Sequence, residues 1–245
     1  MNVRDLGGQT IEGGGVTRLG VVVRADNVRK LTAAGWQALR DHGVGRVVDL
    51  RWHEELAEDP PVDVPVEVVH IPLFGAHRLE TRYERFAEIS AEVEDAAEFM
   101  RRLYGSYLEE HPAAFADALA AVASANGTVV VHCTAGKDRT GLVAALLLRI
   151  AGVGIDEIAA DYGLTDMPAV AATGPTGIPG HGPIELTGEE ARAREFVLAA
   201  PPQGIAMVLR DLDERHGSAA SYLEHAGLER TTIAELRRRL TGADS

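Results

Sequence analysis

Cysteine, lysine and long apolar runs are scarce in this chain of 245 residues. The single cysteine, Cys133, cannot form an internal disulfide, so the fold gains no stability from an oxidising compartment. The longest apolar run, 142–148, is too short to span a bilayer, and the N-terminus lacks the apolar core of a signal peptide. We therefore expect no stable membrane insertion and a cytoplasmic location, with export by a route that uses no cleaved signal as the alternative.

Positive charge is also in short supply. The formal net charge is −13, and the chain holds two lysines, Lys30 and Lys137, beside its arginines. Nucleic acids and anionic membranes bind cationic surfaces, so this charge argues against both as partners. Hydrophobic residues make up 46% and charged residues 25% of the chain, as in ordinary globular proteins. A small cationic pocket inside an acidic globular protein fits this composition, whereas a broad cationic surface does not.

The order of the expected elements indicates the fold class. Short β-branched or apolar runs are typical of buried strands, and here they alternate with segments of helical period. Thr32 is placed to cap a helix that ends at Gly43, and a strongly apolar helix closes near Gly152. The expected strands cover residues 21–24, 46–51, 66–71 and 128–132. Alternation of this kind predicts an α/β fold with a central, mainly parallel sheet flanked by helices.

We expect one domain over residues 1–245, because no repeat or low-complexity tract divides the chain. Residues 80–119 read as a helical insertion, which is either a lid or a packed helical layer. Residues 168–188 are rich in Gly, Pro and Thr and predict a long surface loop. Residues 189–245 predict a helical C-terminal part packed on the core.

The most informative segment contains the cysteine. Cys133 precedes Arg139 by six residues, between the end of an expected strand and a helix that begins at about residue 139 or 140. A lone cysteine is usually a small buried hydrophobe, but this context favours catalysis. Gly136 lets the backbone turn, and successive N–H groups beside a helix N-terminus bind anions. The same field favours the thiolate form of a cysteine.

A thiolate in an anion-binding loop fits hydrolysis of phosphate monoesters. Cys133 is the expected nucleophile, attacking phosphorus to form a cysteinyl-phosphate intermediate without metal or cofactor. Arg139 is expected to bind two phosphoryl oxygens through its planar fork. Thr140 is expected to donate a hydrogen bond to the departing thiolate, and His132 to support the loop rather than exchange protons. The backbone cradle for the substrate is expected to include Thr134, Ala135, Gly136 and Lys137.

The segment 132–141, His-Cys-Thr-Ala-Gly-Lys-Asp-Arg-Thr-Gly, resembles the signature loop of the cysteine-dependent protein tyrosine and dual-specificity phosphatase superfamily. The start of the chain, Asn-Val-Arg-Asp-Leu-Gly-Gly at 2–8, is similar to that of a bacterial branch, as is segment 217–223. The resemblance implies activity on phosphotyrosine proteins, and in that branch also on phosphoserine, phosphothreonine and phosphoinositides. Arg4 and Asp5 are expected to have a structural role.

The general acid is less evident. Many tyrosine phosphatases carry an aspartate on a mobile loop before the cysteine loop, but the matching region here, 72–77, has none. Asp138 is the preferred candidate, because superfamily members acting on lipid phosphates have a similar Lys-Asp-Arg run. The alternative is that Asp138 pairs with Lys137 or Arg139 and shapes the loop. Weaker candidates for the acid are Asp49, Glu80, Glu84 and His77.

Lys137 bears on the choice of substrate. A cation beside the phosphate cradle could bind a second phosphate, as on an inositol ring, or an acidic peptide, or it could point to solvent. We expect a protein tyrosine phosphatase with possible dual specificity. The alternatives are a phosphoinositide phosphatase and a catalytically silent phosphate-binding module. Nothing in the sequence indicates the oligomeric state.

Overall fold

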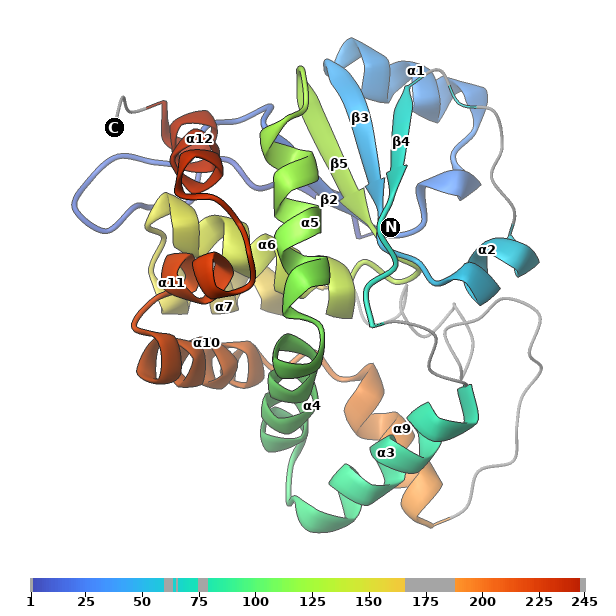
Figure 1. Ribbon diagram of the computed structural model, residues 1–245. Coiled ribbons are helices and arrows are strands. Elements are labelled where there is room, and N and C mark those ends of the chain that lie inside the picture. Colours follow the sequence, from blue (N-terminus) through green and yellow to red (C-terminus); the bar gives the residue numbers. More distant parts are fainter. Residues whose placement is uncertain (1, 60–63, 65, 75–78, 166–187, 243–245) are drawn as a thin grey trace.

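Five strands form one central sheet in this computed structural model, which describes residues 2–59, 64, 66–74, 79–165 and 188–242 (Figure 1). The strand order is β1-β2-β5-β3-β4, and every neighbouring pair is parallel except β1 with β2. The strands are β1 (Arg4–Asp5), β2 (Val22–Ala25), β3 (Val44–Asp49), β4 (Glu67–His70) and β5 (Thr128–His132). The predicted α/β class with a mainly parallel sheet is confirmed.

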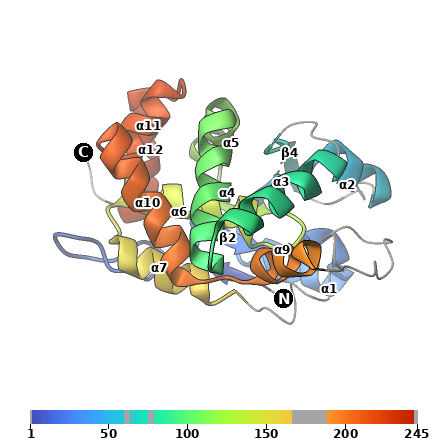
Figure 2. The same ribbon diagram turned by 90° about the horizontal axis from the view of Figure 1, so that it is seen from below.

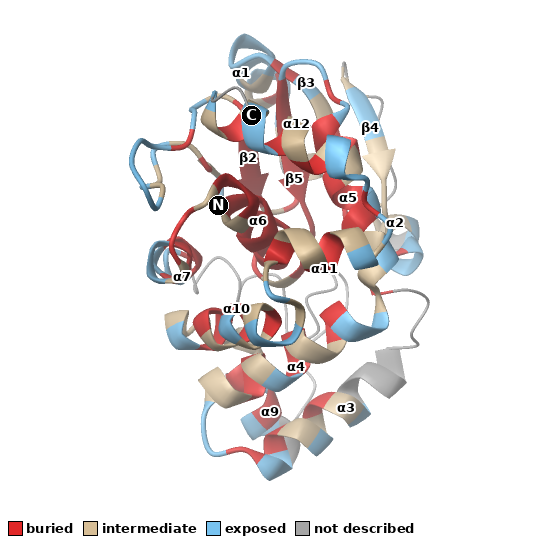
Figure 3. Cartoon of the chain, turned by 60° about the vertical axis from the view of Figure 1, so that its left-hand side comes forward, coloured by how far each residue is buried: buried red, intermediate tan, exposed pale blue. Residues whose placement is uncertain are grey.

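Alternation of side chains along the strands fills both faces of the sheet. Val47 and Val130 pack on the face covered by η1 (Val28–Lys30) and α1 (Ala33–Asp41), around Trp36. Val48, Val129 and Val131 point to the opposite face, where α5 (Pro112–Ala123) and α6 (Asp138–Ala151) lie. Figure 3 shows β2, β5 and α6 coloured almost entirely as buried. A sheet buried on both faces explains why its strands are nearly continuous apolar runs.

The predicted helix boundaries follow from local chemistry. The Thr32 hydroxyl accepts a hydrogen bond from the Gly35 N–H and caps α1, as predicted. Gly152 ends α6 in the left-handed conformation, with φ of 86°. α2 (His53–Glu58) was not predicted; its N-terminus is closed by Glu55, whose carboxylate accepts from the Trp52 N–H. The predicted loop at 168–188 lies outside the described residues, except for Gly188.

The remaining helices come from two segments of the sequence and pack among one another beside the sheet (Figures 1 and 2). The expected insertion contains α3 (Leu79–Glu92), α4 (Ala96–Glu110) and most of α5. The C-terminal part contains α9 (Glu189–Leu198), α10 (Pro202–His216), α11 (Ala219–His225) and α12 (Arg230–Thr241), and α7 (Ile155–Gly163) precedes it. α3 packs on α9, α4 and α7 pack on α10, and α12 packs on α5 and α6. Within the described ranges, no helix is both long and apolar enough to cross a membrane.

Candidate active site

The loop between β5 and α6 lies at the carboxyl end of the parallel strands. Gly136 has φ of 68°, and a Cβ atom there would lie 2.7 Å from the carbonyl oxygen of Ala25, so this position requires glycine. The Gly136 N–H points into the loop and lies 3.3 Å from Sγ of Cys133. Cys133 itself is 2% exposed. An N–H group directed at sulfur stabilises a thiolate, which is the form that acts as a nucleophile.

Arg139, in the first turn of α6, is held by a carboxylate from another element. Its Nη2 donates to Oε1 of Glu55 at 2.8 Å, and its Nη1 donates to Oε2 of the same residue. Glu55 also accepts from the Thr134 hydroxyl. Burial would raise the pKa of Glu55, but the charge and hydrogen bonds of Arg139 dominate and lower it to about 2. Glu55 is therefore ionised at neutral pH.

The bonds to Glu55 orient Arg139 without using all of its donors. A guanidinium has five N–H groups. One N–H of each Nη binds Glu55, and Nη1 also donates to the Leu50 carbonyl at 3.3 Å. The guanidinium carbon lies 4.5 Å from the centre of the Trp52 ring, which fixes the plane. The Nε–H and the second Nη2–H then form a fork of the kind that binds two phosphoryl oxygens.

Thr140 lies one residue further along α6. It is fully buried, and its hydroxyl has no hydrogen-bond partner among the residues that the structure describes. A buried hydroxyl without a partner lowers the stability of the fold, so such a group in a site calls for a functional explanation. This observation fits the predicted hydrogen bond to the departing thiolate.

The outer side of the loop is tied to β2 and to the N-terminal segment. The Gly136 carbonyl accepts from Arg24 at 2.8 Å and from the Asn2 amide at 3.0 Å. Asp161 on α7 pairs with both Arg24 and Arg4, at 2.7 Å each. Burial would raise the pKa of Asp161, but the bonds and charges of these two guanidiniums lower it. Arg4 thus contacts the support of the loop, in line with the structural role expected for it.

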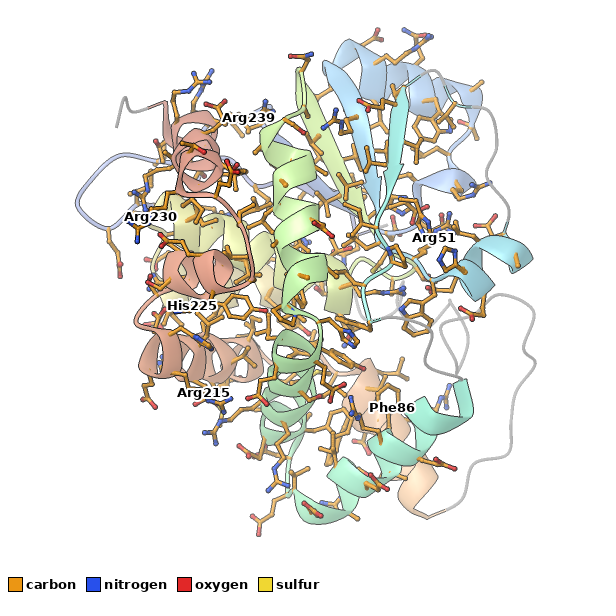
Figure 4. The ribbon with its side chains drawn as sticks, viewed as in Figure 1. Arg51, Phe86, Arg215, His225, Arg230 and Arg239 are labelled. Atoms are coloured by element: carbon orange, nitrogen blue, oxygen red, sulfur yellow. The ribbon has the colours of Figure 1, made fainter. Side chains whose placement is uncertain are left out.

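His132 contacts the backbone of the loop and a buried ion pair. One ring nitrogen lies 3.2 Å from the Cys133 carbonyl and the other 3.5 Å from Oδ2 of Asp49. Asp49 also pairs with Arg51, which Figure 4 labels near the ends of β3 and β4. Burial would raise the pKa of Asp49, but His132 and Arg51 hold it well below its ordinary value. Asp49 therefore has no proton to donate at neutral pH.

Asp138 occupies the N-terminus of α6 and faces two donors. Its Oδ1 lies 2.7 Å from Nζ of Lys137 and accepts from the Tyr104 hydroxyl at 2.6 Å. Burial would lower the pKa of Lys137, but Asp138 and Tyr162 more than offset this and raise it. Lys137 is 1% exposed, so its charge is directed at Asp138 within the protein.

The remaining candidates for the acid are Glu84, Glu80 and His77. Glu84 is exposed on α3. His77 and the side chain of Glu80 lie outside the described residues. In the described part of the chain, no three His, Cys, Asp or Glu side chains are arranged to hold a metal ion.

Sequence reasoning missed Glu55, Trp52, Arg24, Asp161 and Tyr104. Glu55 follows Trp52 by three residues, the spacing of an N-terminal capping box, but Trp52 is not the Ser or Thr that marks such a box in a sequence. Tyr104 lies four residues from both Met100 and Leu108, so helical periodicity places it on the buried face of α4. Neither signal reveals that these residues contact the cysteine loop, because that depends on how distant segments pack.

Comparison with known proteins places this chain in a family. The tyrosine phosphatase family matches residues 1–242. A triple specificity protein phosphatase PtpB of Mycobacterium tuberculosis is 30% identical over 254 residues, covering 92% of each chain. A tyrosine-protein phosphatase of Nostoc commune is 29% identical and covers 89% of this chain and 73% of its own. A putative tyrosine-protein phosphatase of Cupriavidus necator is 35% identical over 66% of this chain and 59% of its own. Matches of this extent, to a chain whose cysteine loop lies beside an oriented arginine, show that it belongs to the tyrosine phosphatase family.

Proposed function

We propose that this tyrosine phosphatase hydrolyses phosphotyrosine in proteins through a cysteinyl-phosphate intermediate on Cys133. The observation that carries the proposal is the oriented guanidinium of Arg139 at the start of α6, which Glu55 of α2 holds. It directly follows the loop in which the Gly136 N–H points at Sγ of Cys133. Phosphoryl transfer places charge on the equatorial oxygens, and a fixed fork stabilises that charge without reorganisation. The backbone N–H groups of residues 134–139 complete the cradle.

The two chemical steps use the same residues. In the first step, Sγ of Cys133 bonds to phosphorus, the bond to the ester oxygen breaks, and Asp138 gives its proton to that oxygen. In the second step, water attacks phosphorus, Asp138 takes a proton from it, and the thiolate departs. The buried Thr140 hydroxyl donates a hydrogen bond to the departing sulfur. The thiolate is the nucleophile in this scheme, so the scheme includes no metal or cofactor.

Activity on phosphoserine, phosphothreonine and phosphoinositides is the second part of the proposal, and it rests on the relative named for triple specificity. Lys137 is the residue that would bind a second phosphate of an inositol ring. Its ammonium lies 2.7 Å from Asp138 and is almost fully buried. A second phosphate therefore has to displace the ammonium from this pair. The helical insertion expected at residues 80–119 would cover the site if it acts as a lid.

The test measures phosphate release from a phosphotyrosine peptide and from a phosphoinositide in parallel, with EDTA present and Cys133→Ser as control. Release that is lost in the variant, with substrate binding retained, supports the cysteinyl-phosphate route. The ratio of the two rates decides the phosphoinositide activity. A folded, reduced protein that binds both substrates but releases no phosphate would instead be a silent phosphate-binding module.

A further inference from the structure

We propose that Tyr104 on α4 is a positioning residue for Asp138, so that the helical insertion is built into the acid–base machinery of the site. This inference rests on the proposed function, in which Asp138 exchanges the proton. It assigns a part in the reaction to a helix whose sequence suggested either a lid or a packed layer. Tyr162 on α7 supports Tyr104 from the other side.

Four polar groups from three elements meet here. The Tyr104 hydroxyl lies 2.6 Å from Oδ1 of Asp138, 2.7 Å from the Tyr162 hydroxyl and 3.4 Å from Nζ of Lys137. Tyr104, Tyr162 and Lys137 are at most 1% exposed, whereas the side chain of Asp138 is 25% exposed. Asp138 is thus the member of the group that has an accessible edge, and the others form its buried support.

The direction of the hydrogen bonds follows from the number of protons. A phenol carries one proton. Tyr104 donates it to Asp138, so the bond between the two phenols runs from Tyr162 to Tyr104. Burial is the main reason that the pKa of each phenol is raised, and the charge of Asp138 adds to it for Tyr104. Both phenols therefore remain protonated donors at neutral pH.

The local packing makes this chain of hydrogen bonds rigid. A Cβ atom on Gly141 of α6 would lie 3.0 Å from the Tyr162 ring, so glycine allows α7 to approach α6 closely. The buried face of α4 includes Phe99 and Leu103, which fix the helix that carries Tyr104.

The consequence concerns the geometry of the carboxyl group. Tyr104 and Lys137 both donate to Oδ1, so they restrain rotation of the carboxyl group, and a proton carried by Asp138 lies on Oδ2. Two donors on one oxygen also stabilise the carboxylate left after proton donation. Among the charged groups that act on this network, Arg139 on α6 interacts with Asp138, and Arg24 on β2, itself paired with Asp161, interacts with Tyr162.

The test compares Tyr104→Phe with the wild type and with Tyr222→Phe. Tyr222 is a matched control, because its buried hydroxyl donates a single bond to the Leu108 carbonyl. The substrates are phenyl phosphate, with a poor leaving group that needs a proton, and p-nitrophenyl phosphate, with a good one. We expect kcat/KM of Tyr104→Phe to fall about tenfold for phenyl phosphate and less than about threefold for p-nitrophenyl phosphate. The alkaline limb of the pH profile should move up by about one pH unit, because the carboxylate loses a donor.

The inference would be overturned if Tyr104→Phe behaved like Tyr222→Phe, that is, if both variants lost kcat/KM by the same factor for the two substrates and kept the pH profile of the wild type. If Tyr104→Phe does not fold, Tyr162→Phe decides the question: it should shift the profile in the same direction by a smaller amount, and an unchanged profile overturns the proposal. The failures are distinguishable. A wild type without phosphate release contradicts the proposed function itself. An active wild type in which Asp138→Asn changes the leaving-group dependence, but neither tyrosine variant does, contradicts the role of Tyr104 alone.

Discussion

Replacing Glu55 with glutamine tests whether the orientation of Arg139 controls the rate. The carboxylate accepts two bonds from Arg139, one from the Thr134 hydroxyl and one from the Trp52 N–H. Glutamine at this position retains one acceptor oxygen, and its NH₂ group faces N–H or O–H groups that donate to an oxygen in the wild type. The guanidinium then loses its bidentate partner, and its plane is held mainly by Trp52 and the Leu50 carbonyl.

The size of the effect follows from the shift in the pKa of Glu55. A change from 4.5 to about 2 corresponds to about 3 kcal/mol of favourable interaction with the ionised form. Breaking one partner of a buried ion pair costs roughly 3–5 kcal/mol, which agrees with this value. Removing the negative charge also leaves Arg139 more attractive to a phosphate dianion. We expect orientation to dominate in the transition state, so kcat should fall by about 100-fold while KM changes by less than about threefold.

The assay is steady-state hydrolysis of a phosphotyrosine peptide, with urea unfolding of the same samples. Glu110→Gln is the matched control, because Glu110 forms a bidentate pair with Arg85 that is about one-third exposed. The control should lose at most about 1 kcal/mol of stability and keep its kcat. A folded Glu55→Gln protein with kcat within threefold of the wild type would refute the role assigned to Glu55. A rise in KM with unchanged kcat would show that Arg139 acts in binding alone.

Three further predictions concern the support of the loop. Gly136→Ala should lower both the melting temperature and kcat, because its Cβ would lie 2.7 Å from the Ala25 carbonyl; unchanged values would show that the loop adjusts freely. Asp161→Asn should cost about 3 kcal/mol in urea unfolding, since Arg4 and Arg24 lose their shared carboxylate, and a loss below 1 kcal/mol would contradict this. The contribution of Glu55 to stability is present above pH 4.5 and is lost as pH falls toward 2. The wild type should therefore lose about 2 kcal/mol more than Glu55→Gln between pH 7 and pH 3, and equal losses would argue against the depressed pKa.

The sheet and the cysteine loop could be predicted because their signals are local. β5 and the loop after it form one continuous segment, so the nucleophile and its arginine are recognisable six residues apart. The caps at Thr32 and Gly152 are equally local and were predicted correctly. The two periodicities of the backbone distinguish strand segments from helical ones, and the helix boundaries follow from the caps.

The supporting residues could not be found in this way. Glu55 lies 84 residues before Arg139 in the sequence, and Tyr104 lies 34 residues before Asp138. Their contacts depend on the angle at which α2 and α4 pack against α6, which no periodicity encodes. The sequence also left open whether Asp138 pairs with Lys137; burial of the lysine beside the carboxylate is a property of the packed structure.

Three buried arginines of the site share one arrangement. Arg139, Arg24 and Arg51 are all almost fully buried, and each is paired with a buried carboxylate, namely Glu55, Asp161 and Asp49 in that order. Burying a guanidinium without a partner would cost far more than the loop could offset, and pairing each one leaves little net charge beneath the cysteine. The field that attracts a phosphate dianion must then come largely from directed N–H groups: the loop backbone, the N-terminus of α6, and the Nε–H and Nη2–H of Arg139. Such donors act over hydrogen-bond distances, so this acidic protein can select a phosphate by geometry while its overall charge repels anions at longer range.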